Sequence, residues 1–229
     1  MKTKKLYQTD TFETGTDKDL EIIFLHHSSL IFNLAGYYIY IDPIADYKHN
    51  KVDYTEFPKA DLIVITHEHW DHFNPQTIAL LKKPGTRIIV NQRVADMLHE
   101  GEVMKNGDSL RINDDITIEA VPAYNTTPED LQYHPKGRDN GYIFDIGKLR
   151  IYVSGDTEPI QEMKQFRNIN IAFLSVNQPY TMTPEECIKA AQYIKPKILY
   201  PYHYIGTDIE KVAEGLKDSG IHVRIRKMA

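Results

Sequence analysis

Short apolar segments bounded by turn residues recur along the whole chain. They are rich in Ile, Val, Phe and Tyr, a composition typical of β-strands. The run DLIVIT at 61–66 shows no alternation of apolar and polar positions, which favours a central strand covered on both faces. The predicted strand segments are 21–27, 29–34, 37–43, 61–66, 87–90, 108–120, 141–156, 169–176, 197–201 and 222–226.

Helical signals separate these segments. Pro184 stands at the first position of a predicted helix, and Thr183 and Glu186 have the spacing of a capping box. The predicted helices are 74–81, 92–100, 183–195 and 208–217. Strand clusters with interspersed helices occur in both halves without a low-complexity linker. This organisation predicts one α/β domain over residues 1–229 with two sheets.

Composition limits the function. The chain has 27 basic and 32 acidic residues and a net charge of −5, which argues against a general nucleic-acid binder. No apolar stretch has the length of a signal peptide or a membrane span, so a soluble cytoplasmic protein is expected. The single cysteine, Cys187, excludes an intramolecular disulfide and a multi-cysteine metal site. We expect Cys187 to be a small buried residue on a helix.

The residues THEHWDH at 66–72 carry the clearest chemical signal. They follow the apolar run at 61–66, so the backbone is leaving the sheet and their side chains can converge. An H-x-H spacing places His67 and His69 on the same side of an extended segment, whereas Asp71 and His72 can face a second point. Imidazole and carboxylate without thiolate suit zinc, iron, manganese or nickel, and argue against a closed structural zinc site. A histidine-rich surface loop is the alternative.

THEHWDH fits the T-H-x-H-x-D-H signature of the metallo-β-lactamase superfamily, and the resemblance extends over nearly the whole chain. IDP at 41–43, GDT at 155–157 and PYHY at 201–204 resemble further segments of that superfamily. LHHSSL at 25–30 and QPYTMTPEE at 178–186 are similar to the branch that includes ascorbate-6-phosphate lactonase and the N-acyl-phosphatidylethanolamine phospholipase D enzymes. The resemblance implies a four-layer αββα sandwich.

The resemblance also implies roles for individual residues. The implied metal ligands are His67 and His69 for a first ion, Asp71, His72 and His203 for a second, and Asp156 as a bridge between both. One or two divalent ions are expected, with zinc favoured and manganese, nickel or iron as alternatives. Asp71 and Asp156 are the candidate catalytic carboxylates. A lone SGD turn or an isolated histidine would by itself be unremarkable, and each gains weight from the order of all these segments.

One position departs from the superfamily pattern. A third histidine for the first metal is expected at a strand end, where this chain has Asn125, and an amide oxygen is a weak ligand for zinc. His134, which lies in the long polar loop 121–140, could reach back to replace it, or could face substrate or solvent. His27 is a further candidate, as an outer ligand or as a donor to a substrate oxygen, and its neighbour His26 should point away. Trp70 is predicted to pack against the pocket rather than to bind substrate.

The predicted function is a metal-dependent hydrolase in which a metal-bound hydroxide attacks an ester-type bond. The lactonase resemblance favours a lactone or carboxylic ester, with phosphodiester hydrolysis as the alternative. A second alternative is a metal- or ligand-binding protein whose first metal site is impaired. A small-molecule substrate is expected, but the sequence names neither that substrate nor an oligomeric state.

Overall fold

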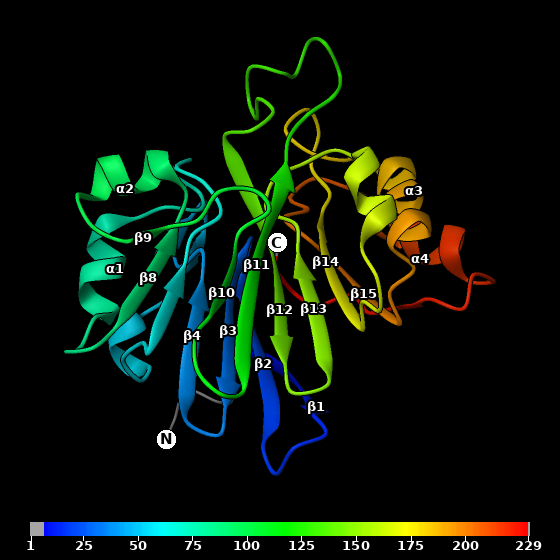
Figure 1. The fold of residues 1–229 in the computed structure, drawn as a ribbon. Helices are drawn as coiled ribbons and strands as arrows, with labels where there is room; N and C mark the ends of the chain where they lie inside the picture. Colours follow the sequence, from blue (N-terminus) through cyan, green and yellow to red (C-terminus); the bar gives the residue numbers. More distant parts are fainter. Residues whose placement is uncertain (1–6, 229) are drawn as a thin grey trace. The chain divides into compact units, whose positions relative to one another are not determined.

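The computed structural model describes residues 7–228, so the lysine-bearing start of the chain at 1–6 and Ala229 lie outside the described residues. Contacts divide the chain into two compact units (Figure 1). Unit 1 contains the residues up to Met104 together with Met228, and unit 2 contains residues 105–227. A single domain over residues 1–229 stays a prediction.

Unit 1 contains a seven-stranded mixed sheet. In spatial order its strands are β1 (Gln8–Glu13), β2 (Asp19–His26), β3 (Ser29–Leu34), β4 (Tyr37–Ile41), β7 (Leu62–Val64), β8 (Arg87–Val90) and β9 (Glu102–Val103). The first four strands run antiparallel, and β4, β7, β8 and β9 run parallel. The short strands β5 (Asp46–Tyr47) and β6 (Asn50–Lys51) pair separately.

Helices α1 (Pro75–Leu81) and α2 (Gln92–Leu98) lie on one side of the unit 1 sheet (Figure 1). Asn74 and Asn91 cap them, because each side chain accepts a hydrogen bond from a backbone N–H in the first turn. Apolar side chains of both helices and of the sheet form one buried cluster, which includes Ile63, Ile65, Ile78, Leu81, Ile88 and Val94. Burial of each such side chain contributes roughly 1.5–3 kcal/mol. A 3-10 turn at Tyr54–Glu56 also belongs to this unit.

Unit 2 contains a second seven-stranded mixed sheet. Its strands are β10 (Ser109–Arg111), β11 (Ile116–Ala123), β12 (Asp139–Ile146), β13 (Leu149–Val153), β14 (Ile171–Ser175), β15 (Ile198–Tyr202) and β16 (His222–Val223). The first four are antiparallel, and β13 to β16 are parallel. The sheet of each unit therefore consists of a four-stranded meander followed by three parallel strands. The sequence did not reveal this structural repeat.

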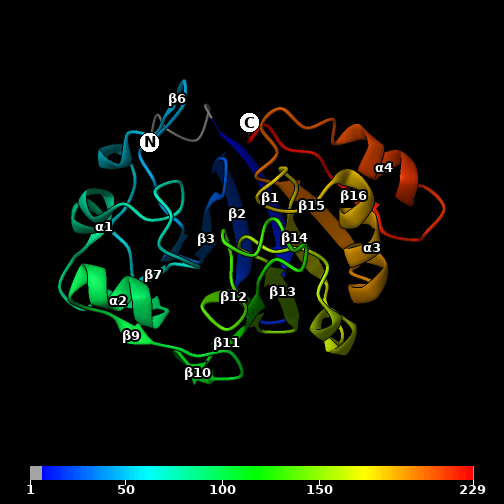
Figure 2. The same ribbon diagram turned by 90° about the horizontal axis from the view of Figure 1, so that it is seen from above.

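Helices α3 (Pro184–Ile194) and α4 (Glu210–Leu216) lie side by side next to β15 and β16 in unit 2 (Figure 2). The predicted capping box is present, since the Thr183 hydroxyl accepts from the Glu186 N–H and the Glu186 carboxylate accepts from the Thr183 N–H. Cys187 is buried on α3, as predicted, and burial raises the pKa of its thiol. A 3-10 helix at Gln161–Gln165 also belongs to this unit.

The predicted strands and helices are all present, with shifts of a few residues at their ends. The loop predicted over 121–140 is shorter, because β11 continues to Ala123 and β12 begins at Asp139. The last strand ends at Val223 rather than at residue 226. Strand β1 was not predicted, since its sequence QTDTFE is polar and its side chains are largely exposed. Within residues 7–228 no helix has the length and apolar character needed to cross a membrane.

Candidate metal centre

Asp42 anchors the predicted metal-ligand loop of unit 1. It is fully buried and follows β4 with a positive φ of 44°. Its Oδ1 accepts the Thr66 N–H at 2.8 Å. Its Oδ2 accepts the Thr66 hydroxyl at 2.7 Å and the Nδ1–H of His72 at 2.8 Å. One buried carboxylate therefore fixes both the start of the THEHWDH segment and the ring of its last histidine.

These hydrogen bonds determine which nitrogen of each imidazole is available to a metal. Thr66 donates its only hydroxyl proton to Asp42, so it accepts from the Nδ1–H of His67 at 3.0 Å. His72 likewise donates its Nδ1–H to Asp42. Nε2 is then the lone-pair nitrogen of both rings, the tautomer that a metal ligand requires. The two buried rings lie with their centroids 4.1 Å apart.

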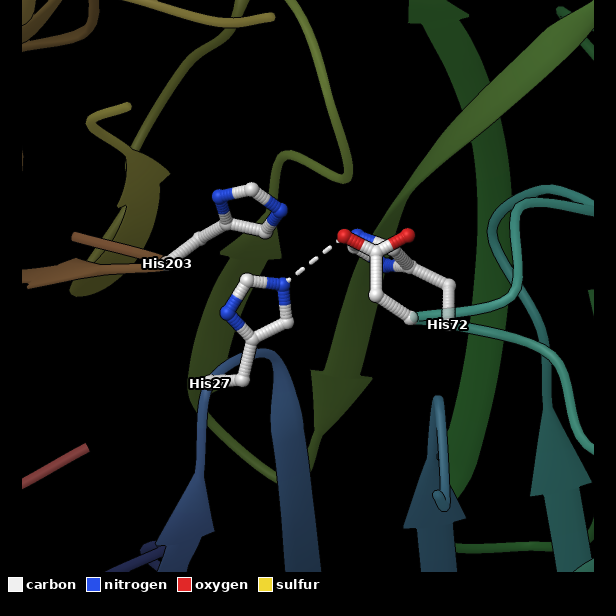
Figure 3. A group of neighbouring side chains, drawn as sticks. His27, His72 and His203 are labelled. Carbon is white, nitrogen blue, oxygen red and sulfur yellow. Dashed lines mark hydrogen bonds and ion pairs between the residues drawn. The ribbon is translucent and has the colours of Figure 1, made fainter. Parts of the chain in front are cut away.

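A group of three possible ligands forms within unit 1. One ligand atom each from His27, Asp71 and His72 lie within 4.8 Å of one another. His27 Nε2 is 3.1 Å from Asp71 Oδ2, and the dashed line in Figure 3 marks this bond from the His27 ring. His27 is buried in the turn after β2, with a positive φ of 51°. His26 instead makes its hydrogen bond to the Ile44 carbonyl, which separates the roles of the two neighbouring histidines as expected.

His67 and His69 form the other predicted pair of unit 1. Their ring centroids are 4.6 Å apart, and one ligand atom of each lies within 4.8 Å of the other. A tight turn follows, because the His69 carbonyl accepts the N–H groups of His72 and Phe73 at 2.9 and 2.8 Å. The turn brings His72 back toward His67, so the motif offers nitrogen ligands at two neighbouring points.

Asp156 is the centre of the candidate ligands in unit 2. It is 2 % exposed and follows β13 through Gly155, whose positive φ of 60° permits the turn. The Gly155 N–H donates to the Tyr202 hydroxyl at 3.0 Å, which ties this turn to the end of β15. His203, the next residue, places Nε2 at 3.3 Å from Asp156 Oδ2 and has a positive φ of 55°. The structure thus brings together the two unit 2 residues that the sequence separates by 47 positions.

His134 joins the same carboxylate oxygen. Its Nε2 lies 3.5 Å from Asp156 Oδ2, and the ring is fully buried. Its Nδ1 hydrogen bonds to the Tyr180 carbonyl at 3.1 Å, and because a carbonyl only accepts, Nδ1 carries a proton. In the neutral form of the ring the Nε2 lone pair therefore faces Asp156. Two acceptors facing each other are the arrangement that a shared cation stabilises.

Asn125 bonds to the backbone of the loop that carries His134. Its Nδ2 donates to the backbone carbonyls of Asp130 at 3.2 Å and Tyr180 at 2.9 Å, and its backbone N–H donates to the His134 carbonyl at 2.8 Å. The Asn125 side chain therefore closes the loop that carries His134. Its Oδ1 is buried and makes no hydrogen bond to another described residue. Of the candidates to replace the missing third histidine, His134 is the one whose ring nitrogen lies 3.5 Å from Asp156.

A buried acid missed by the sequence analysis supports this loop. Glu158 is 1 % exposed, and its Oε2 accepts hydrogen bonds from the Thr126 N–H, the Thr126 hydroxyl and the Thr127 N–H. The Thr157 hydroxyl donates to the Tyr124 carbonyl at 3.0 Å. The residues after Asp156 thus hold the start of the His134 loop. The signal was a second acid two residues after the predicted bridging aspartate.

Trp70 packs as predicted on one side only and is otherwise more exposed than a packing residue would be. Its side chain is 67 % exposed, and its ring stacks on the buried Tyr47 ring with centroids 5.4 Å apart. Only part of the indole is used in packing, because the Tyr47 ring stacks on one of its faces. His49, His99 and His222 are exposed, as predicted for histidines outside the matched segments.

The chain belongs to the beta-lactamase superfamily, since the model of the beta-lactamase superfamily domain matches residues 21–203. This match covers most of β2, the strands from β3 to β15 and all of the predicted ligands. It confirms the predicted metallo-β-lactamase fold, the αββα class. Membership of this superfamily also leads us to expect that the His and Asp side chains described above bind metal. The narrower branch suggested by the sequence stays a prediction.

The relatives agree with this assignment. One similar protein is a metal-dependent hydrolase, so named by inference, from Parabacteroides distasonis ATCC 8503, and its crystal structure is known. Its sequence is 51 % identical to this chain. The two structures match with a TM-score of 0.94 over 97 % of this chain and 100 % of that one. A UPF0173 metal-dependent hydrolase of Thermococcus kodakarensis is 27 % identical over 81 % of this chain and 84 % of its own. A metallo hydrolase of Ignicoccus hospitalis shares the fold, at 23 % identity and a TM-score of 0.78 over 92 % of this chain and 96 % of that one. These names support metal-dependent hydrolase activity.

Proposed function

We propose that this protein hydrolyses a lactone or another carboxylic ester of a small molecule with one or two divalent metal ions, zinc being favoured. His67, His69, His134 and Asp156 would bind one ion. Asp71, His72, His203 and Asp156 would bind the other. The assignment follows the superfamily order of ligands at each position except His134, which stands in for the histidine that Asn125 replaces.

The observation that carries the proposal is the fixed orientation of the imidazoles. Asp42 and Thr66 accept from the Nδ1–H groups of His72 and His67, so Nε2 is the lone-pair nitrogen of each neutral ring. The Tyr180 carbonyl does the same for His134. Because an imidazole whose outer nitrogen donates to a carboxylate or carbonyl is a stronger and better oriented ligand, this pattern supports a metal centre rather than a set of packed histidines.

The donor set also suits a catalytic site better than a purely structural one. It contains nitrogen and carboxylate oxygen but no thiolate, since Cys187 is buried on α3. Two predicted site residues, His27 and His203, are non-glycine residues with positive φ, and so is Asp42, which holds the ligand loop. Such strained backbone costs on the order of 1–3 kcal/mol per residue and clusters at functional sites.

A divalent metal bound by these residues would lower the pKa of a water molecule and polarise the electrophile. The side chains then have separate tasks. Asp71 accepts from His27 at 3.1 Å through Oδ2 and is a candidate ligand and proton acceptor. The Ser28 hydroxyl donates to the Asp71 carbonyl at 3.2 Å and fixes the turn beside it. Asp156, with imidazoles on one oxygen, is the second candidate proton acceptor.

The test is turnover by purified protein with added Zn²⁺, Mn²⁺ or Ni²⁺. The substrates are γ-butyrolactone and 4-nitrophenyl acetate for the proposed reaction, and bis(4-nitrophenyl) phosphate for phosphodiester hydrolysis. His203→Ala is the inactive comparison, and His222→Ala, at an exposed histidine of the same unit, is the matched control. We expect metal-dependent hydrolysis of the lactone or ester that His203→Ala loses and His222→Ala retains.

Two results would overturn the proposal. Turnover of the phosphodiester alone would assign the phosphodiesterase function. Tight metal binding without turnover of any substrate would assign a binding protein.

A further inference from the structure

Trp70 has the most exposed large apolar side chain of the described residues, at 67 %. It lies in the sequence between His69 and Asp71, both proposed metal ligands. Single exposed apolar residues are common on protein surfaces and by themselves indicate nothing. Trp70 differs because a rigid set of rings holds it beside the metal-binding residues.

The Trp70 ring is held in place by stacking. It lies nearly parallel to the Tyr47 ring, with centroids 5.4 Å apart and an interplanar angle of 17°. Tyr47 is 4 % exposed and itself stacks on His27, with centroids 3.7 Å apart and an angle of 20°. His27 in turn bonds to Asp71. The orientation of the indole is therefore coupled to a proposed metal ligand through two buried rings.

This arrangement has the properties of a binding surface. A Tyr47 ring covers at most one face of a larger indole, so the high exposure of Trp70 leaves the other face in solvent. An aromatic side chain with two torsion angles, already ordered by packing, loses little conformational entropy when a ligand stacks on it. Packing alone would instead favour a buried indole, because exposed apolar area contributes nothing to the core.

We propose that the exposed face of Trp70 is a subsite for a planar, unsaturated group of the substrate, adjacent to the bond that is hydrolysed. The inference rests on the proposed function, since it gives a substrate class to the same site. A flat unsaturated group stacks on an indole with a favourable geometry that a saturated ring cannot match. A cationic group is disfavoured, because a divalent metal ion and Lys48, which lies 5.6 Å from the Tyr47 ring centroid, carry positive charge nearby.

The chain offers a direct measurement, because Trp70 is its only tryptophan. Zinc-loaded protein is titrated with sodium benzoate and, separately, with sodium cyclohexanecarboxylate. The two carboxylates have the same charge and ring size but differ in planarity. Tryptophan emission reports stacking, and calorimetry gives both dissociation constants. We expect saturable changes in emission with benzoate, and benzoate to bind about 3- to 10-fold more tightly than cyclohexanecarboxylate.

Variants separate stacking from general apolar contact. Trp70→Leu should reduce the benzoate preference to about 1, and Trp70→Phe should restore part of it. Met97→Ala removes another exposed apolar side chain of unit 1 and should keep the full preference. For an aryl ester, Trp70→Leu should raise KM about 3- to 10-fold with little change in kcat, because stacking binds substrate and transition state alike.

The inference is overturned if Trp70→Leu keeps the benzoate preference, or if benzoate binds without changing the emission of Trp70. Metal content and ester turnover, measured on the same preparations, distinguish failure of the Trp70 subsite from failure of the proposed function. Wild-type protein that turns over esters without preferring benzoate refutes the subsite alone. Wild-type protein without metal or turnover refutes the proposed function, whereas saturable benzoate quenching of Trp70 in that protein would still support the subsite.

Discussion

His72 Nδ1 lies 2.8 Å from Asp42 Oδ2, and neither side chain is exposed to solvent. Asp42 is not a proposed metal ligand, yet it determines which nitrogen of His72 is available. We expect Asp42→Asn to keep the shape of the side chain but to weaken metal binding about 10- to 100-fold. Competition with a chelator measures the loss. Asp46→Asn, at an exposed residue of the same unit, should leave the affinity unchanged, and equal affinity in both variants would contradict the role of Asp42.

Asp156 is the residue whose removal should have the largest effect on metal content. Asp156 is the proposed ligand of both ions. Its replacement by alanine should therefore reduce the bound metal from between one and two equivalents to nearly none. Elemental analysis of purified Asp156→Ala measures this directly. Asp145→Ala is the control, since Asp145 is partly exposed and pairs with Arg150 in the same unit. Unchanged metal content in Asp156→Ala would exclude the bridging role.

His134 and Asn125 can be separated by paired variants. His134→Ala should lose about one metal equivalent, because its Nε2 faces Asp156 and its Nδ1–H is held by the Tyr180 carbonyl. Asn125→Ala should have a smaller effect, since the Asn125 amide bonds to backbone carbonyls of the loop. Metal titration monitored by calorimetry gives the number of sites in each variant. A larger loss in Asn125→Ala than in His134→Ala would reverse the assignment.

Much of the fold was predictable from local patterns. The apolar runs predicted the strands because a buried strand requires β-branched and aromatic residues regardless of its partners. The capping box at Thr183 and the Asn74 cap predicted helix starts for the same reason, since the hydrogen bonds form within one turn. The THEHWDH segment predicted a cluster of candidate ligands because four such side chains lie within six residues of one another.

The remaining features depend on contacts between distant residues. His134 is oriented by a carbonyl 46 residues later in the chain, which no local pattern encodes. His27 meets Asp71 across 44 residues, through a turn that requires a left-handed backbone at a histidine. The high exposure of Trp70 was not predicted, because an aromatic residue inside a motif gives no information about its exposure. The shared order of strands in the two units has no sequence counterpart, since strand order depends on pairing rather than on residue identity.

The ion pair between Arg87 and Glu102 should make stability depend on pH. Two hydrogen bonds of 2.7 Å from the Arg87 guanidinium lower the pKa of Glu102 below its ordinary value of 4.5. A carboxyl pKa that is lower in the folded state stabilises the fold above the unfolded pKa, and this contribution is lost as the pH falls through the folded pKa. Both side chains are partly exposed, so Arg87→Ala should cost less than about 1 kcal/mol at pH 7.

Urea unfolding at several pH values tests this linkage. The difference between wild type and Arg87→Ala should close as the pH falls below 4.5. Lys51→Ala, which removes a highly exposed partner of Asp46, should show no resolvable difference at any pH. A difference for Arg87→Ala that stays constant down to acid pH would mean that packing of the arginine stem, rather than its charge, is responsible.

Gly141 connects the stability of β12 to the position of Asp156. A Cβ at this glycine would lie 2.8 Å from the Ser154 carbonyl oxygen and 3.1 Å from that of Val153, and backbone atoms cannot move aside as a side-chain end can. Gly141→Ala should therefore cost about 1–3 kcal/mol of unfolding free energy and displace the segment that leads into Asp156. Urea unfolding and metal titration should both show the loss. In Gly215→Ala the added Cβ meets only Ile188 side-chain atoms, so metal affinity should be unchanged. Full metal affinity in folded Gly141→Ala would show that the Asp156 segment does not depend on this close approach.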